Sequence, residues 1–397
     1  MKLGLVVQRY GLDIAGGAEL HCRLVAEHLL ESHQVEVFTT CAKDYVSWKN
    51  EYPQGTEVIN GVPVHRFLVK KKRNIRTFEN VQNLVFHEQQ SEAMENLWIK
   101  ENGPFSPRLL KAVQSRPDID VWILFSYRYW TTAASLDFLR KKVLLVPTAE
   151  HDPALYLGVV KALFHLPGAI AYNSLEEKSL IQTISGNQAV PGEVVGVGLV
   201  ESDEMKQTLK EDFKVDQDNP YMLYIGRIDK NKGCDHLFRL YRRYREEAQA
   251  DIDLVLIGRP VIPIPNYPGI RHLGFVSEKA KIEALLGCRF LIMPSSFESL
   301  SMVLLEAWRH RRPALVNGKC EVLKGQCLRS NGGLAYHNYD EFSASIDYLL
   351  ANPSVGDAMG RQGNVYYREH YSWPVIQKKY ESLLRLVYQK SRREELM

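Results

Sequence analysis

Two glutamates lie on either side of a predicted transition from loop to helix. Glu298 and Glu306 are separated by seven residues, and the apolar run before them ends at Pro294. At a helical rise of about 1.5 Å per residue, their carboxylates would stand about 12 Å apart, too far to flank one glycosidic bond as a catalytic pair. Since a carboxylate accepts hydrogen bonds from a vicinal diol, we expect the two to bind different parts of one long ligand that carries sugar or ribose diols. The alternative is structural, with Glu298 as a charge at the helix N-terminus and Glu306 as a satisfied helix carboxylate.

Two cations follow another predicted strand. Tyr221–Ile225 is apolar, and Arg227 and Lys232 lie in the segment Gly226–Gly233 that leads into a helical pattern. Both charges can converge on one anion, because Arg offers a planar fork to phosphate oxygens and Lys a mobile point charge. The alternative is a pair of solvated surface cations.

A glycine pair, Gly16 and Gly17, follows a predicted strand at Leu3–Val7 and precedes a helical pattern at Leu20–Leu30. Glycines at such a place let the backbone approach a ligand, and the first N–H groups of the helix attract anions. The segment is neither a GxGxxG fingerprint nor a Walker A loop, which disfavours dinucleotide oxidoreductases and P-loop kinases. A plain turn is the alternative interpretation.

Short apolar runs alternate with helical patterns in both halves of the chain. This alternation predicts parallel strands covered on both faces, and therefore an α/β fold of two doubly wound, Rossmann-like domains. The predicted strands are Leu3–Val7, Val35–Thr39, Val121–Phe125 and Val143–Val146, then Tyr221–Ile225, Ile252–Ile257, Phe290–Met293 and Ala314–Val316.

Glycines and a proline crowd into Ala189–Val200, so we expect an N-terminal, acceptor-binding domain over residues 1–190 and a C-terminal domain over residues 191–370. Residues 371–397 contain a last helical pattern, Val375–Tyr388, which is expected to cross back onto the N-terminal domain. Open α/β sheets bind ligands at the carboxyl ends of their strands, so two facing sheets would form a cleft for two substrates.

Composition narrows the class of protein. The chain has 397 residues, and 50 Lys and Arg against 47 Asp and Glu give a formal net charge of +3, which disfavours a nucleic-acid binder. The six cysteines form no CxxC motif, which suits a reducing compartment, and no apolar stretch is long enough for a secretory signal or a membrane span. We expect a cytoplasmic protein, with peripheral contact at the inner face of the membrane as a further expectation.

Taken together, Gly-Gly-x-Glu near the start, Gly-Arg with Lys-Gly after the middle strand, and Glu-x7-Glu after Pro-Ser resemble a known family. They are similar to the retaining nucleotide-sugar glycosyltransferases of the GT-B fold, family 4, over essentially the whole chain. The resemblance implies that Arg227 and Lys232 hold the diphosphate of a UDP-, GDP- or ADP-sugar. It also implies that Gly16 and Gly17 lie against the diphosphate and the acceptor side.

The same resemblance assigns the carbohydrate contacts. Glu306 would bind the donor ribose, and Glu298 with the backbone of Ser299 and Leu300 would hold the transferred sugar. His151 matches the position of a catalytic histidine and would orient a sugar hydroxyl or stabilise charge at the anomeric carbon, with a hydrogen-bonded loop histidine as the alternative. The family transfers with retention by a front-face route.

One segment departs from the family pattern. Its Pro-Asn-Gly-Val-Asp at the interdomain turn appears here only as Val195–Leu199, so the hinge side of the donor pocket is less defined.

No metal or other cofactor is expected. The Asp-x-Asp pairs at Asp118–Asp120 and Asp251–Asp253 each precede an apolar run, so they are interpreted as residues at the start of strands. Arg227 and Lys232 can supply the charge that Mg²⁺ would otherwise provide.

Two further segments concern the acceptor. Lys70–Arg73 with Arg76 forms the densest basic patch and precedes an apolar helical face, which fits an anionic membrane surface or a phosphorylated lipid acceptor, or a merely solvated surface. Tyr127–Trp130 follow a predicted strand and are expected to face the cleft, or else to pack between the domains.

The leading expectation is an enzyme that transfers a hexose to a hydroxyl of a glycan, glycolipid or lipid-linked acceptor with retention of configuration. The alternatives are a GT-B nucleotide-sugar epimerase, a phosphorylase-like transferase, or a catalytically silent sugar-nucleotide binding partner.

Overall fold

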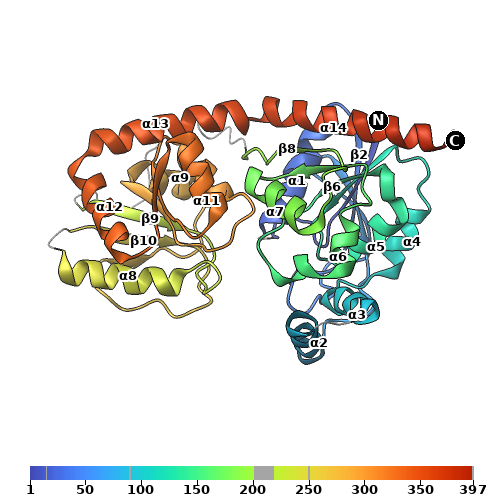
Figure 1. Cartoon of the computed structure of the whole chain (residues 1–397), viewed down its shortest axis with the longest axis horizontal. Helices are drawn as coiled ribbons and strands as arrows, with labels where there is room; N and C mark the ends of the chain where they lie inside the picture. The colour runs from blue at the N-terminus through green and yellow to red at the C-terminus, as the bar shows by residue number, and fades with distance from the viewer. Residues whose placement is uncertain (15, 89–90, 201–218, 249–250, 396–397) are drawn as a thin grey trace. The chain divides into compact units, whose positions relative to one another are not determined.

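The computed structural model describes residues 1–14, 16–88, 91–200, 219–248 and 251–395 (Figure 1). It divides into two compact units, the first formed by Met1–Gly198 with Trp373–Met397 and the second by Leu199–Ser372. The first unit therefore extends beyond the expected residue 190, because Gly192–Val194 forms a strand of its sheet.

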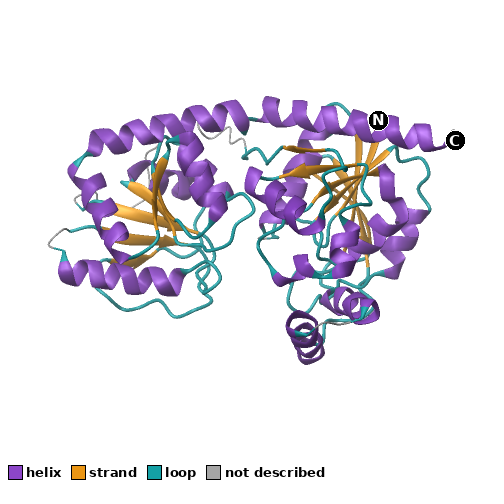
Figure 2. Cartoon of the chain, viewed as in Figure 1, coloured by secondary structure: helices purple, strands orange, loops and turns teal. Residues whose placement is uncertain are grey.

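The first unit is built on one sheet with helices on both faces (Figure 2). Among the described residues its strands run in the order β3-β4-β2-β1-β5-β6-β7-β8, and all neighbours are parallel except β3 and β4. The strands are β1 (Lys2–Val6), β2 (Gln34–Thr40), β3 (Gly55–Ile59), β4 (Val62–Phe67), β5 (Val121–Phe125), β6 (Val143–Val146), β7 (Ala169–Tyr172) and β8 (Gly192–Val194).

Most helices of this unit connect successive parallel strands. The exception to the layered arrangement is the pair α2 and α3, which lie side by side below the sheet in Figure 1. The helices are α1 (Gly17–Leu29), α2 (Ile75–His87), α3 (Glu92–Asn102), α4 (Pro107–Gln114), α5 (Trp130–Leu139), α6 (Gly158–Leu163), α7 (Leu175–Ser185) and α14 (Trp373–Glu395), with 3-10 turns η1 (Arg140–Lys142) and η2 (Pro153–Tyr156).

The second unit repeats the architecture with a fully parallel sheet. In the part of the chain that the structure describes, the strand order is β11-β10-β9-β12-β13-β14. Its strands are β9 (Tyr221–Ile225), β10 (Asp253–Ile257), β11 (Ile270–His272), β12 (Phe290–Met293), β13 (Ala314–Asn317) and β14 (Gly333–Tyr336), and its helices are α8 (Cys234–Glu247), α9 (Glu278–Gly287), α10 (Met302–Arg309), α11 (Glu321–Ser330), α12 (Tyr339–Ala351) and α13 (Pro353–His370).

The burial of the strands explains why their sequences are continuously apolar. Every residue of β5, β6, β9, β10 and β12 is buried, because helices cover both faces of each sheet. The expected α/β fold of two doubly wound, Rossmann-like domains is confirmed.

The last helix, α14, packs on the first unit. The apolar face expected from its sequence is buried there, and each such side chain contributes about 1.5–3 kcal/mol when removed from water. Trp373 stacks on His28 with ring centroids 3.4 Å apart, and the Tyr380 hydroxyl lies 3.2 Å from His21 Nε2. Helix α14 therefore completes the hydrophobic core of the first unit.

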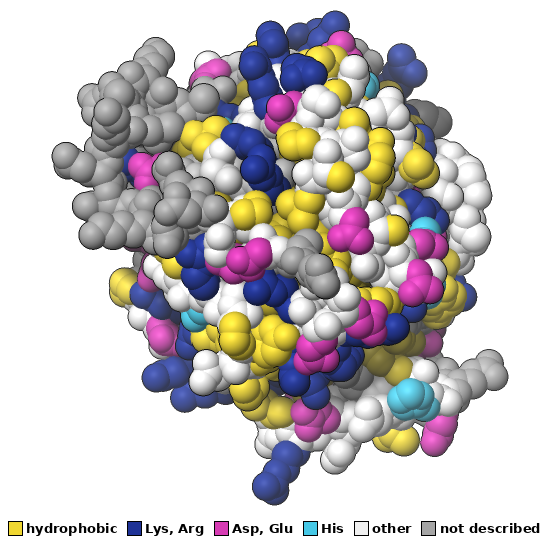
Figure 3. All heavy atoms as spheres, turned by 90° about the vertical axis from the view of Figure 1, so that its left-hand side faces the viewer, with side chains coloured by type: hydrophobic (Ala, Val, Ile, Leu, Met, Phe, Trp, Pro, Cys, Tyr) yellow, Lys and Arg dark blue, Asp and Glu magenta, His cyan; other side chains and the backbone are white. Residues whose placement is uncertain are grey.

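The surface drawn in Figure 3 carries basic, acidic and apolar side chains interspersed with one another. This distribution agrees with the small formal net charge of +3. No described helix is both long and apolar enough to span a lipid bilayer.

Candidate active site

The carboxyl ends of β9 and β12 bring two loops of the second unit together. The strands are neighbours in the sheet, so the loop 226–233 after β9 lies beside the loop 294–301 after β12. Gly233, at φ +73°, comes so close to the second loop that an added Cβ would lie 2.4 Å from the Pro294 carbonyl oxygen. Only glycine fits there, both for its backbone angle and for the space.

Asp229 organises the first loop. Its Oδ1 accepts a hydrogen bond of 2.8 Å from the Lys232 backbone N–H, and its Oδ2 pairs with the Arg227 guanidinium. The Tyr224 hydroxyl donates to the Arg227 carbonyl at 2.7 Å. Both cations are thus held on a loop that the buried Asp229 carboxylate fastens to the end of β9.

Lys232 joins this loop to the next. Its Nζ lies 2.7 Å from Glu298 Oε1, with 30% of the Lys232 side chain and 10% of the Glu298 side chain exposed. The structure therefore brings Arg227, Asp229, Lys232 and Glu298 together in a group that we call the Lys232 cluster. It combines two cations of the kind that can bind phosphate with a carboxylate that can accept hydrogen bonds from hydroxyls.

The loop that carries Glu298 ends in a helix N-terminus. Ser301 adopts φ +71° and caps α10, its side chain accepting a 3.4 Å hydrogen bond from the Leu304 N–H. The Leu300 carbonyl accepts a 2.5 Å hydrogen bond from Gln326 Nε2, which fixes the backbone of Ser299 and Leu300 just before the helix. Backbone N–H groups at a helix start favour anionic or polar ligand atoms.

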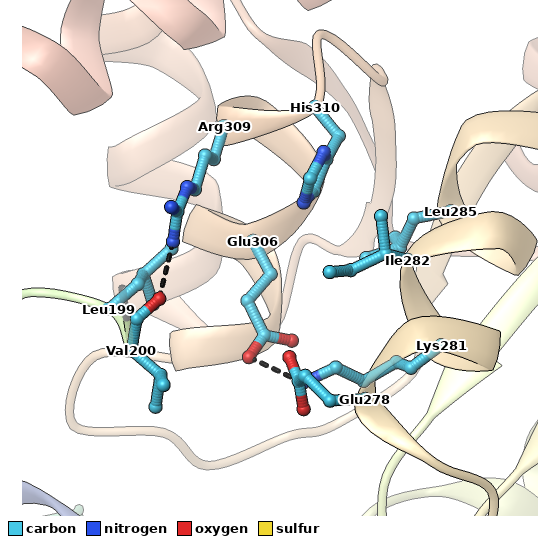
Figure 4. A pocket seen from close by; sticks show the side chains of 9 residues that line it. All are labelled: Leu199, Val200, Glu278, Lys281, Ile282, Leu285, Glu306, Arg309 and His310. Atoms are coloured by element: carbon cyan, nitrogen blue, oxygen red, sulfur yellow. Dashed lines mark hydrogen bonds and ion pairs between the residues drawn. The ribbon is translucent and has the colours of Figure 1, made fainter. Parts of the chain in front are cut away.

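Glu306, one turn further along α10, lies in a different place. Its carboxylate lines a hollow within the second unit, shown in Figure 4, and its Oε1 is 2.9 Å from Lys281 Nζ on α9. Glu306 is the one expected site residue among those that line this hollow, which we call the Glu306 hollow. Its lining consists of Leu199, Val200, Glu278, Lys281, Ile282, Leu285, Glu306, Arg309 and His310.

Burial shapes the electrostatics of the hollow. It raises the pKa of Glu306, while the positive charge of Lys281 acts in the opposite direction. Burial also works against the Lys281 ammonium, but the carboxylates of Glu306 and Glu278 outweigh it and raise the pKa of that lysine. Burial, with help from the charges of Arg309 and Lys281, lowers the pKa of His310 to about 4. At neutral pH the hollow therefore holds the neutral His310 imidazole beside the contact between Lys281 and Glu306.

In the first unit, Gly16 and Gly17 begin α1. Gly16 precedes the helix in an extended conformation, and a Cβ added to it would lie 2.2 Å from Glu19 Oε2. Gly17 faces open space, with nothing within 4 Å of an added Cβ. The buried Glu19 carboxylate turns back to β1, where its Oε1 accepts a 2.8 Å hydrogen bond from Arg9 Nε and a 3.0 Å bond from Gln8 Nε2. The glycine segment is therefore shaped by a buried ion pair.

His151 is exposed in the loop after β6. Its Nε2 lies 2.9 Å from the hydroxyl of Tyr156, which is itself half exposed. The same loop is tied down at Asp152, whose Oδ2 accepts a 2.6 Å hydrogen bond from Arg128. His151 is thus a hydrogen-bonded loop histidine on the carboxyl side of the sheet, and its catalytic role stays a prediction.

Backbone strain and a buried acid support this loop. Thr148 and Ser126, which follow β6 and β5, both have positive φ (+50° and +66°), and their hydroxyls lie 2.9 Å apart. Positive φ is costly for a β-branched residue and often occurs at functional sites. Glu177 on α7 accepts a 2.5 Å hydrogen bond from the Ala149 N–H, and burial raises the pKa of Glu177 to about 8.

The aromatic rings of Tyr127, Tyr129 and Trp130 each pack against another ring of the first unit. Tyr127 is buried in the core of the first unit beside Phe164, and Trp130 packs edge-on against Phe105 at 4.7 Å between ring centroids. Tyr129 packs edge-on against Trp48. The expectation that these residues face a cleft was wrong for Tyr127, which is buried, whereas Arg128, Tyr129 and Trp130 are half buried and for them it stays a prediction.

Two of the basic side chains at residues 70–76 make contacts within the first unit. Arg73 donates to the Asn102 carbonyl at 3.1 Å and lies over the Trp48 ring, and burial lowers its pKa to about 10. Lys71 is exposed and pairs with Glu101 at 3.2 Å, and Lys70, Lys72 and Arg76 are also exposed. The segment therefore retains a smaller basic surface than its sequence suggests.

Both Asp-x-Asp pairs lie at the amino ends of strands. Asp118 pairs with Lys2 at 2.7 Å, and Asp253 pairs with Arg271 at 2.7 Å. Within the described ranges, no three His, Cys, Asp or Glu side chains gather as a metal site would require. Metal independence stays a prediction.

Three residues that shape these places had no role assigned to them from the sequence, although Glu19 belongs to the Gly-Gly-x-Glu motif. Asp229 had a signal, since it stands between the two cations of Gly226–Gly233. Glu19 stood beside the glycine pair, but its partner Arg9 belongs to another element. Lys281 had no local signal, because its contact with Glu306 joins two helices that are separate in the sequence.

Comparisons of the sequence with known proteins find glycosyltransferases. Residues 205–365, which span most of the second unit, match the family model described as glycosyl transferases group 1. An uncharacterised glycosyltransferase of Methanocaldococcus jannaschii is 24% identical over an alignment of 415 residues that covers 95% of this chain and 96% of that protein.

Solved structures share the fold. Sucrose-phosphate synthase from Thermosynechococcus elongatus has a TM-score of 0.70 at 15% identity, covering 98% of this chain and 99% of that chain. The Anabaena protein HepE, solved in complex with UDP-glucose, has a TM-score of 0.64 at 15% identity, covering 96% and 99%. These likenesses confirm the expected GT-B fold class, and together the comparisons support a glycosyltransferase built from two Rossmann-like domains.

Proposed function

We propose that this chain is a retaining hexosyltransferase of the family 4 type. It moves a hexose from a UDP-, GDP- or ADP-sugar to a hydroxyl of a glycan, glycolipid or lipid-linked acceptor, and it needs no metal ion. The observation that carries the proposal is the 2.7 Å pair of Lys232 and Glu298, which joins a phosphate-binding group to a hydroxyl-binding group across two loops. The glycosyltransferase relatives, and the UDP-glucose bound by HepE, support the choice of donor.

The Lys232 cluster suggests how the donor is held. Arg227 and Lys232 bind the diphosphate, and they neutralise the charge that grows on it as the sugar leaves. Glu298 and the backbone of Ser299 and Leu300 bind the hydroxyls of the transferred sugar. Because Glu298 pairs with Lys232, donor binding would exchange this ion pair for contacts to phosphate and sugar.

The reaction we propose is a front-face substitution. The acceptor oxygen forms its bond to the anomeric carbon on the face from which the phosphate oxygen departs, so the configuration is retained. The acceptor proton passes to the departing phosphate oxygen, and no protein base is required. His151 orients a hydroxyl of the transferred sugar, and Gly16 and Gly17 bind the diphosphate and the acceptor side through their backbone.

The charges of the Lys232 cluster support the proposed metal independence. Transferases that use Mg²⁺ do so to neutralise the diphosphate, and here Arg227 and Lys232 supply two positive charges at the end of β9. The proposal therefore assigns to side chains the role that a metal ion has elsewhere.

For the acceptor we propose peripheral contact with an anionic, cytoplasmic membrane surface. The exposed cations Lys70, Lys72 and Arg76 lie at the start of α2, and each is worth about 1 kcal/mol near such a surface. Sedimentation with phosphatidylglycerol vesicles tests it, with Lys70, Lys72 and Arg76 changed to Gln. Loss of binding supports the contact, and unchanged binding or no binding by the native chain rejects it.

The experiment for the main proposal incubates the purified chain with radiolabelled UDP-, GDP- and ADP-hexoses, with and without acceptor extracts. We expect transfer to an acceptor, with the anomeric configuration of the donor kept in the product by NMR. Binding without turnover would indicate a silent binding partner, and interconversion of the donor sugar an epimerase. Either outcome would reject the proposed transfer.

A further inference from the structure

One oxygen of the Glu306 carboxylate is buried in the Glu306 hollow and accepts no hydrogen bond from the described residues. Glu306 uses Oε1 for its 2.9 Å contact with Lys281 Nζ. Its Oε2 is buried and has no hydrogen-bond partner among the described residues. An unpaired buried carboxylate oxygen is costly, so a ligand that donates a hydrogen bond to it gains more than one that meets an exposed oxygen.

Lys281 holds the first oxygen from a second helix. Its Nζ lies 2.9 Å from both Glu306 on α10 and Glu278 on its own helix α9, and only 17% of its side chain is exposed. On the same side of α10 the Arg309 guanidinium donates at 2.6 Å to the Val200 carbonyl, as Figure 4 shows. The 2.9 Å contact with Lys281 therefore fixes the orientation of the Glu306 carboxylate.

We propose that Lys281 is a positioning residue for the ribose of the donor. By holding Oε1 it keeps Oε2 directed into the hollow, where Oε2 accepts a hydrogen bond from a ribose hydroxyl. This inference rests on the proposed function, since it assigns the ribose of the nucleotide to the Glu306 hollow.

The proposed contact predicts that the site prefers a ribonucleotide to a dideoxyribonucleotide. A 2′,3′-dideoxy nucleotide lacks the hydroxyls, so it leaves Oε2 unpaired and binds more weakly than the ribonucleotide. Without Lys281, the buried Glu306 loses the positive charge that favours its ionised form and the contact that fixes its orientation. The preference for ribose then disappears, while binding of the diphosphate by Arg227 and Lys232 remains.

Titration calorimetry tests this with UDP, GDP and ADP, each beside its 2′,3′-dideoxy counterpart. We expect the native chain to bind the ribonucleotide about tenfold more tightly than the dideoxy form, as for loss of one hydrogen bond to a charged group. Lys281→Met should weaken ribonucleotide binding by about the same factor and bring both forms to similar affinity. Lys281→Arg, which keeps a cation, should restore part of the preference.

The matched control is Lys279→Met, which removes an exposed lysine from the same helix and should behave as the native chain. Unchanged dideoxy binding by Lys281→Met shows that its site is folded. Equal weakening of both nucleotide forms, or a full ribose preference in that variant, would overturn the inference. Failure of the native chain to bind any of the three diphosphates would instead reject the proposed function.

Discussion

Removal of Glu298 should slow turnover without weakening the binding of a nucleoside diphosphate. Glu298 Oε1 pairs with Lys232 Nζ at 2.7 Å, and the two side chains are proposed to contact the donor at different atoms. Since 30% of the Lys232 side chain is exposed, the ion pair is worth at most about 1 kcal/mol. Glu298→Ala removes this competitor of phosphate, so the affinity for a nucleoside diphosphate should be unchanged or rise by up to about fivefold.

Turnover should fall in the same variant. Glu298 is proposed to bind the transferred sugar, and a hydrogen bond to a charged group is worth about 1.5–3 kcal/mol. If that bond is made most strongly in the transition state, its loss slows transfer by about 10- to 150-fold.

Two assays separate these effects, calorimetry with the nucleoside diphosphate alone and initial rates with the nucleotide sugar. Glu321→Ala, which removes a side chain that is 69% exposed on α11, is the control for a lost glutamate in the same unit. Unchanged turnover in Glu298→Ala would refute the role given to Glu298. A matching loss of diphosphate affinity would show instead that Glu298 only supports the loop.

Three other predictions address the metal and the stability of the first unit. Transfer should proceed at an unchanged rate in EDTA, and loss of activity that Mg²⁺ restores would reject the metal-free mechanism. Glu19→Gln leaves the buried Arg9 charge without its carboxylate, so the free energy of unfolding measured with urea should fall by about 3–5 kcal/mol; a fall below about 1 kcal/mol would contradict the role of this pair. Arg116 lowers the pKa of Glu36 from 4.5 to about 2, so this carboxylate stabilises the fold above pH 4.5 and its contribution is lost as the pH falls toward 2. Glu36→Gln should flatten the pH dependence of the melting temperature in that window, and an unaltered slope would exclude this linkage.

Buried parallel strands could be predicted closely from the sequence. The bounds expected for β5, β6, β9 and β12 are those of the structure, because strands covered on both faces are continuously apolar. Strand β14 (Gly333–Tyr336) was missed, since its first residues are only half buried and begin with glycine. Strand β11 has three residues, too few for a periodic signal.

The candidate site was predictable where it depends on loops that follow strands. Arg227, Lys232 and Glu298 each follow the carboxyl end of a strand, and neighbouring parallel strands bring such loops together. Glu306 was expected on the same helix pattern, but its partner Lys281 depends on how α9 packs against α10, which no local spacing encodes. The burial of Tyr127 could not be predicted for the same reason, because the direction of an aromatic side chain after a strand depends on the helix that follows.

Binding of an activated sugar to the second unit through the Lys232 cluster is tested most directly by a crystal structure of the chain with a bound nucleotide sugar. We expect diphosphate oxygens within hydrogen-bond distance of Lys232 Nζ and the Arg227 guanidinium, with a sugar hydroxyl on Glu298. A nucleotide sugar seated away from all three side chains would contradict the account.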